Sequence, residues 1–246
     1  SDSIKFQGGL KGLVTMDQSS LKVFLDESQF YFTDTLWTLK DSSYFNYFNG
    51  EINSQVFIST TSQDVSFSCI SNDIIDTINL VLNHFEMANI SPWLSKVNSS
   101  VKGSVNGDVI IVSDSLNNKF YSEIITSNLE LNDANFGALN LSFNYDDTQD
   151  IQLIQGHSLK DDKKALEFSG NYNSLVDSNN MQIFIDVNDF NINHINTYLP
   201  FLDPLKGMFT GNLNLYGNIN EPKFEGEFVA KEVYLKVPYL NVDFKT

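Results

Sequence analysis

Hydrophobic and polar residues alternate along most of this chain. Between residues 206 and 219 the odd positions carry Gly, Phe, Gly, Leu, Leu, Gly and Ile, whereas the even positions are mostly polar. A period of two is typical of a β-strand whose two faces meet different surroundings. One apolar and one wet face per strand is typical of antiparallel sheet, so the pattern predicts an all-β fold. The same alternation returns in residues 139–145, 166–172, 224–230 and 233–239.

Clusters of Asn, Asp, Ser and Gly separate these runs at spacings of about ten residues, which supplies the turns between strands. Only residues 91–97 and 193–199 predict helices, and both are short. Ser91 is a good N-cap before Pro92, and the second stretch ends at Pro200. We expect these helices to cover exposed sheet edges. The covering side chains would be Trp93, Leu94, Tyr198 and Leu199.

A motif of apolar, Lys, Gly, x, apolar, x, Gly, x, apolar occurs twice, in residues 101–109 and, 104 residues later, in 205–213. A weaker copy lies in residues 10–14. Repeated units of this kind predict modules stacked along an axis. The expected division is a sheet segment in 1–90, a module with a leading helix in 91–192, and the start of an equivalent module in 193–246, all within one continuous rod.

Glycine within these strands needs a reason, because Gly weakens a strand by about 0.5–1 kcal/mol. A sharp bend, where backbones approach each other closely, is one reason, and a β-bulge is another. The glycines expected to have such structural roles are Gly103, Gly107, Gly207, Gly211, Gly217 and Gly226.

The charge of the chain limits its partners. The sequence has 31 Asp and Glu against 15 Lys, no Arg, and a formal charge of −16. Nucleic-acid binding is excluded because it requires clustered basic residues, and an anionic membrane surface would repel the chain. With 20 Phe, the chain is nevertheless too hydrophobic for a disordered acidic segment.

Cys69 is the only cysteine, so neither an intrachain disulfide nor a thiolate cluster can form. It lies in an alternating run and is expected to be an inert strand residue. No aliphatic run approaches the roughly 20 residues of a membrane-spanning helix. The chain begins at Ser1 without Met, so we expect an excerpt of a longer protein, with any anchor or export signal outside it.

No catalytic or metal-binding pattern stands out. His84, His157 and His194 are isolated from one another and from other ligands. The acidic residues 146–150 lack a calcium-loop signature and predict a solvated turn. No nucleophile elbow, phosphate loop or nucleotide fingerprint occurs. We therefore expect no enzyme activity, no cofactor and no metal.

The repeated glycine motif, continued by residues 222–228 and 237–244, resembles the TamB family, the translocation and assembly module within the AsmA-like group. Residues 28–39 and 50–52 resemble strand pairs in the Bacteroidetes branch of that family. The resemblance extends over nearly the whole chain. It is most specific in residues 205–244, whereas the first hundred residues match only in their pattern of alternating residues.

The resemblance implies a long antiparallel or mixed sheet folded lengthwise into a trough, a β-taco, with an apolar concave face. Such proteins are thought to span the periplasm from an inner-membrane anchor to an outer-membrane β-barrel of the TamA type. They resemble bridge-type proteins that carry phospholipid acyl chains, and they are linked to outer-membrane protein assembly. The expected groove-lining residues are Val105, Val109, Ile111, Leu139, Leu141, Phe143, Phe209, Leu213, Leu215, Phe224 and Phe228.

Three alternatives fit the same alternation. A closed sandwich or β-helix would pack its apolar faces on each other and leave a dry core. A structural rod could bind a client strand at an exposed edge. A carbohydrate-active β-helix would need a cleft of aromatic and acidic residues, which the sequence does not locate. The period of two does not separate a dry core from an apolar groove.

Overall fold

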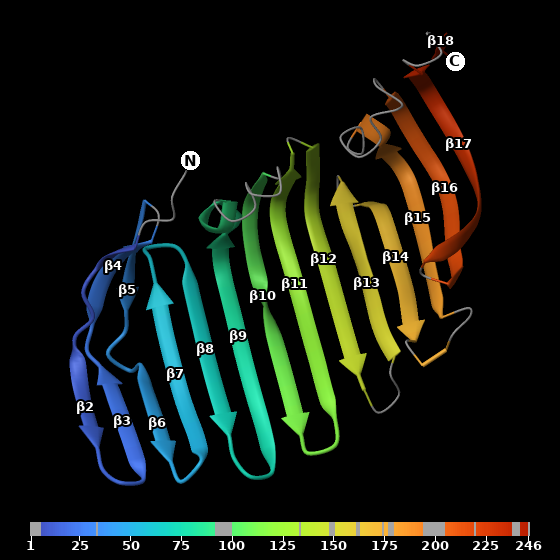
Figure 1. Ribbon diagram of the computed structural model, residues 1–246. Coiled ribbons are helices and arrows are strands. Elements are labelled where there is room, and N and C mark those ends of the chain that lie inside the picture. The colour runs from blue at the N-terminus through green and yellow to red at the C-terminus, as the bar shows by residue number, and fades with distance from the viewer. Residues whose placement is uncertain are drawn as a thin grey trace.

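The computed structural model describes residues 6–32, 34–91, 100–132, 134–147, 151–160, 163–173, 175–176, 180–193, 205–218, 220–237 and 242–245. They form an antiparallel sheet of 18 strands, coloured from blue to red in Figure 1. The strands are β1 (Phe6–Gly8), β2 (Gly12–Met16), β3 (Ser20–Leu25), β4 (Ser28–Phe32), β5 (Thr35–Leu39), β6 (Tyr44–Phe48), β7 (Glu51–Ser59), β8 (Asp64–Ser71), β9 (Ile75–Glu86), β10 (Val101–Asp114), β11 (Asn118–Leu131), β12 (Ala134–Asp146), β13 (Ile151–Lys160), β14 (Lys163–Asn173), β15 (Met181–Asn191), β16 (Leu205–Asn218), β17 (Glu221–Val237) and β18 (Val242–Lys245).

The sheet is a meander along most of its length. From β6 to β18 each strand pairs with the next in the chain. On the far side of β7 the edge divides into two ribbons. One continues through β6, β3 and β2, and the other joins the end of β7 through β5 and continues through β4 and β1. The two ribbons lie at the blue end of Figure 1.

The predicted all-β, antiparallel fold is confirmed. The two predicted helices are not supported by the described part of the chain, whose one helical element with both ends described is a 3-10 turn, η1 (Met87–Ile90). Residues 92–99 and 194–204 lie outside the described residues, and with them Trp93, Leu94, Tyr198 and Leu199. The lengthwise trough stays a prediction.

The sheet leaves a large area in contact with water. Its accessible surface is 15758 Å², whereas a compact globular protein of this mass exposes about 11,000 Å². Two sheets packed face to face would bury the inner face of every strand. Among the described residues only six hydrophobic side chains are buried, so most of the sheet is not packed against a second layer.

Most of the small core lies at the end of the sheet where the β5 ribbon meets β9. Trp37 on β5 is 1% exposed and its ring lies 6.3 Å from that of Phe85 on β9. Val101 and Val105 at the start of β10 are also buried. A buried hydrogen bond stabilises the same end of the sheet: the side chain of Asn89 in η1 donates to Gln63 Oε1 at 2.8 Å. This cluster fastens the β1–β4–β5 ribbon to the meander.

The repeat in the sequence has a counterpart in the backbone. Gly103 and Gly207, the first glycines of the two motif copies, sit at β-bulges with φ of +109° and +136°. The facing strands bend at the same places, because Asn128 on β11 and Glu232 on β17 have φ of +52° and +53°. All four residues occupy the left-handed region that side chains other than Gly rarely adopt. The same irregular pair therefore recurs after six strands.

The strand that precedes each motif copy is irregular as well. Register shifts occur on β9 and β15, where His84 and Asp189 have φ of +51° and +46°. Both backbone amides donate to a side chain of the motif strand: to Asn106 Oδ1 at 2.9 Å and to Thr210 Oγ1 at 3.0 Å. The repeating unit thus includes three neighbouring strands, each with its own bulge.

The second glycine of each copy has a different role. A Cβ at Gly107 would lie 2.3 Å from the carbonyl oxygen of Glu123, and one at Gly211 would lie 2.0 Å from that of Glu227. A Cβ at Gly226 would meet the Asn212 carbonyl oxygen at 2.2 Å. These are positions of close approach between strands, where a side chain does not fit. Gly217 has φ of +105° at the turn side of β16.

Asp114 closes the hairpin between β10 and β11. Its carboxylate accepts the backbone N–H groups of Leu116 and Asn117, both at 2.8 Å, and these bonds hold its pKa below the ordinary 3.8. A lowered folded-state pKa stabilises the fold above the unfolded pKa and loses that contribution as pH falls through the folded value. We expect Asp114→Ala to lower the Tm at pH 7 and to differ less from wild type below about pH 4, in thermal melts followed by circular dichroism.

The variant Asp114→Asn is the control for this prediction, because its amide oxygen can still accept a hydrogen bond. It should lose less stability than Asp114→Ala at pH 7. A gap between Asp114→Ala and wild type that stays the same from pH 7 to about pH 3 would contradict the assigned role of the carboxylate.

Candidate functional site

One face of the sheet is apolar, and we call it the apolar face. Directly paired residues of neighbouring strands point to the same side, so the strand registers assign each residue to a face. One row of paired residues crosses eleven strands from β7 to β17 and is apolar except for one Ser and one Gly. The row is Val56, Phe67, Leu80, Val109, Ser122, Phe143, Ile154, Gly170, Ile183, Leu215 and Phe224.

Neighbouring rows on the same face are also largely apolar. One reaches from β2 to β17: Val14, Val23, Phe45, Ser54, Cys69, Ile78, Ile111, Phe120, Tyr145, Gln152, Tyr172, Met181, Gly217 and Pro222. The next one crosses β9 to β17: Leu82, Gly107, Ile124, Leu141, Gly156, Phe168, Ile185, Leu213 and Gly226. A further row contains Leu139, Ser158, Leu166, Val187, Gly211 and Phe228.

All eleven residues predicted to line a groove lie on the apolar face. Nine of them belong to these rows. Val105 lies on the same face opposite Phe85 and Thr126, and Phe209 lies opposite Phe190 and Ala230. The structure thus brings together side chains from β10, β12, β16 and β17.

The eleven residues predicted from the sequence are only a minority of the side chains on the apolar face. Ile78, Leu80, Ile124, Phe168 and Ile183 are equally part of it. The alternation within 78–82 and 183–187 was the available signal. It identifies one apolar side in each strand but does not say which strands are neighbours.

The apolar face is long and its side chains are only partly covered. Fourteen strands lie in sequence from β2 to β17, which corresponds to roughly 60 Å at about 4.8 Å per strand. Aromatic rings contact each other along it, with Phe120 and Phe143 edge to face at 5.3 Å. Phe224 and Phe228 are 76% and 46% exposed, so this end of the face is open to solvent.

Comparison with known proteins shows the family of the chain. A family model described as TamB, N-terminal domain, matches residues 1–230. The chain belongs to the TamB family. No curated protein and no solved structure matches the chain. In the described part of this TamB chain, no helix combines the length and the hydrophobicity needed to cross a membrane.

The opposite, polar face of the TamB chain carries its ion pairs. Lys102 binds Glu130 at 3.0 Å, and Lys119 binds Asp146 at 3.1 Å. The hydrogen bond and the charge of Asp146 raise the pKa of Lys119 above its ordinary value of 10.5. These pairs are partly exposed to solvent, and ion pairs that water reaches add little to stability. The polar face therefore provides charge and contact with water.

The candidate chemical groups of the TamB chain are dispersed. His84 lies at the β9 bulge, His157 accepts a hydrogen bond from the Asn140 amide nitrogen at 2.8 Å, and His194 lies outside the described residues. Within the described ranges no three His, Cys, Asp or Glu residues form a group that could hold a metal ion. Asp147, from the acidic stretch 146–150, accepts a hydrogen bond from Asn118 Nδ2 at 3.0 Å and so braces the neighbouring turn.

Cys69 lies on the apolar face between Ser54 and Ile78 and is partly buried. Its paired neighbours, Ser54 and Ile78, carry no charge. The prediction of an inert strand residue is consistent with this position.

Proposed function

We propose that this chain is a segment of a periplasm-spanning bridge protein whose apolar face carries phospholipid acyl chains between the inner and outer membranes. The observation that supports the proposal most is the row from Val56 to Phe224, which crosses eleven strands and is apolar except at Ser122 and Gly170. Among the described residues no second sheet covers it. The lipid would travel across the strands, along the length of the rod.

The physical chemistry of such a face suits transport more than storage. Each methylene group kept out of water is worth about 0.8 kcal/mol, so an acyl chain is held along its whole length. Neighbouring positions on the face offer similar side chains, which leaves no single site of tight binding. A headgroup can stay in water at the edge of the face, so the absence of Arg from the chain is no obstacle.

Membership of the TamB family supports a wider role in the translocation and assembly module. In this proposal the protein supports outer-membrane biogenesis together with a TamA-type β-barrel, through regions mostly outside this chain. The chain itself acts as a conduit and catalyses no reaction. Its net charge of −16 keeps a rod with a large apolar surface dispersed in water.

One observation favours a second candidate, a rod that binds a client strand. All five residues of β2 are exposed, and β2 pairs with β3 on one side only among the described strands. An open edge of this kind can accept an added strand. A client held there would contact backbone groups rather than the apolar face, so lipid binding separates the two candidates.

The test is to purify the chain without detergent, extract it and search for phospholipid by mass spectrometry. We expect phospholipid to copurify, and we expect the stripped protein to take up a fluorescent fatty acid. Protein that carries no lipid and takes up no fatty acid, while its circular dichroism is that of a β-protein, would contradict the conduit and favour the client-binding rod.

A further inference from the structure

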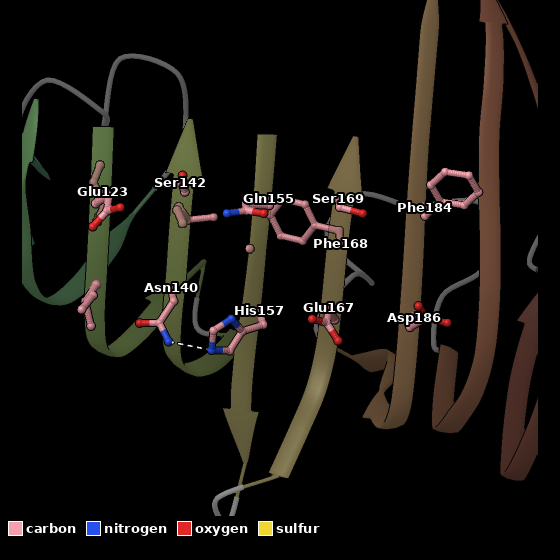
Figure 2. Close-up of a pocket in the computed structure, with 14 residues that line it drawn as sticks. Glu123, Asn140, Ser142, Gln155, His157, Glu167, Phe168, Ser169, Phe184 and Asp186 are labelled. Carbon is pink, nitrogen blue, oxygen red and sulfur yellow. Dashed lines mark hydrogen bonds between the residues drawn. The ribbon is translucent and has the colours of Figure 1, made fainter. Parts of the chain in front are cut away.

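A cavity of about 480 Å³ lies mainly on the polar face, over β11 to β15, and the proposed lipid function makes no use of it. Figure 2 shows its polar side chains on adjacent strands. Glu123, Glu167 and Asp186 supply three carboxylates, and none of the described residues that line the cavity is a lysine. Asn140 and His157 form a hydrogen-bonded pair beside Glu167.

The carboxylates around this cavity oppose one another. In the described registers two strand pairs place acidic residues directly opposite: Asp108 with Glu123, and Glu167 with Asp186. Like charges in such positions are destabilising, because their Cβ atoms are only about 5 Å apart. Glu123 of the first pair and both residues of the second pair line the same cavity, and Asp108 faces Glu123 from outside the lining. A cation placed between two such carboxylates would remove the repulsion.

Most of these carboxylates form no ion pair with a lysine among the described residues. Asp108, Glu123 and Asp186 have no hydrogen-bond or ion-pair partner among the described residues. Glu167 does pair with Lys164, which lies outside the cavity lining. That pair is exposed, with about half of each side chain accessible, and pairs of this type are weak.

Large hydrophobic side chains lie exposed beside the carboxylates. Phe184, Leu153 and Ile125 on the polar face are 46%, 48% and 53% exposed. Phe184 and Ile125 line the cavity itself, and Leu153 lines a smaller depression that continues it. Exposed apolar groups rimmed by charged groups are typical of surfaces that bind another protein.

We propose that this cavity docks an extended basic segment of a partner protein. The two carboxylate pairs are four strand intervals apart, which corresponds to about 19 Å. An extended chain of about six residues covers that distance. Lysines or arginines of the partner would lie between the paired carboxylates. An apolar side chain next to the second pair would contact Phe184, which lies on β15 two residues from Asp186. A second copy of this chain is a poor match in charge, because each copy carries a net charge of −16.

The probe is the dye-labelled peptide Lys-Lys-Gly-Ser-Leu-Ser-Lys-Lys, measured by fluorescence anisotropy at low ionic strength. A peptide of identical composition, Gly-Ser-Lys-Lys-Lys-Lys-Leu-Ser, tests the spacing. We expect the first peptide to bind more tightly, and the double variant Glu167→Gln with Asp186→Asn to weaken its binding about tenfold. The same variant should unfold at a temperature no lower than wild type, because it removes a repulsive pair.

The matched control changes Glu225 and Glu227 to Gln, which removes two charges from the polar face outside the cavity lining. It should weaken binding less than about twofold. Three results would overturn the proposal: no binding of the spaced peptide, equal binding of both peptides, or equal weakening by the two double variants. Each of these can occur whether or not the apolar face binds lipid, so the two proposals are tested separately.

Discussion

The double variant Leu215→Asp with Phe228→Asp is expected to reduce fatty-acid uptake to the background of a lipid-free protein. Leu215 lies between Ile183 and Phe224 in the register, and the ring of Phe228 lies 6.4 Å from that of Phe209. A carboxylate at either position would be stripped of water by a bound acyl chain, at a cost of several kcal/mol. A loss of about 1.4 kcal/mol already weakens binding tenfold. Titration of a fluorescent fatty acid measures the effect.

The control for this experiment places the same two charges on the other side of the same two strands. Asn214 and Val229 are the chain neighbours of Leu215 and Phe228 and point to the polar face, opposite Glu225 and Thr210. The variant Asn214→Asp with Val229→Asp should therefore take up fatty acid as wild type does. Both double variants change net charge equally, so a general effect of charge on a fatty acid cancels between them.

The outcome also distinguishes a loss of contact with lipid from a loss of folding. If uptake survives in the Leu215→Asp and Phe228→Asp variant while the circular dichroism stays that of the wild type, this end of the apolar face does not contact lipid. If the polar-face control loses uptake to the same extent, the loss reflects damage to β16 and β17 and the apolar face has no special role.

In β12, β14, β16 and β17 the alternation identified residues that share one face, but it did not predict how the strands combine. Within β12, Leu139, Leu141 and Phe143 share a face because nothing interrupts the period of two. On β15 the period is broken: Val187 and Phe190 both lie on the apolar face, although one position is odd and the other even. The residue between them that causes the shift is Asp189, with φ of +46°. Asp gives no glycine-like signal, so the bulge was invisible in the sequence.

The features of the polar face were hidden for a related reason. Glu167 and Asp186 belong to different strands, and their opposition depends on the register of a hairpin whose turn is not short. Local spacing therefore could not predict that two carboxylates would face each other. The burial of Trp37 was equally unpredictable, because it depends on a β5 ribbon that leaves the meander and meets β9.

Replacing either second motif glycine by Ala is expected to destabilise the sheet by about 2–4 kcal/mol, because the backbone of two strands must move apart. The new Cβ would lie 2.3 Å from the Glu123 oxygen in Gly107→Ala and 2.0 Å from the Glu227 oxygen in Gly211→Ala. Urea titration followed by circular dichroism measures the change.

Gly9→Ala is the matched control for the two glycine variants, since a Cβ there meets nothing within 4 Å. Its free energy of unfolding should stay within about 0.5 kcal/mol of wild type. Both motif variants should lose stability, because Gly107 and Gly211 occupy corresponding places six strands apart, and Gly211→Ala should lose at least as much because Gly211 also has φ of +157°. If only one of them is destabilising, the repeat is a similarity of sequence without a shared mechanical role. If neither is, the strands tolerate a side chain there and close approach does not explain why Gly recurs in the motif.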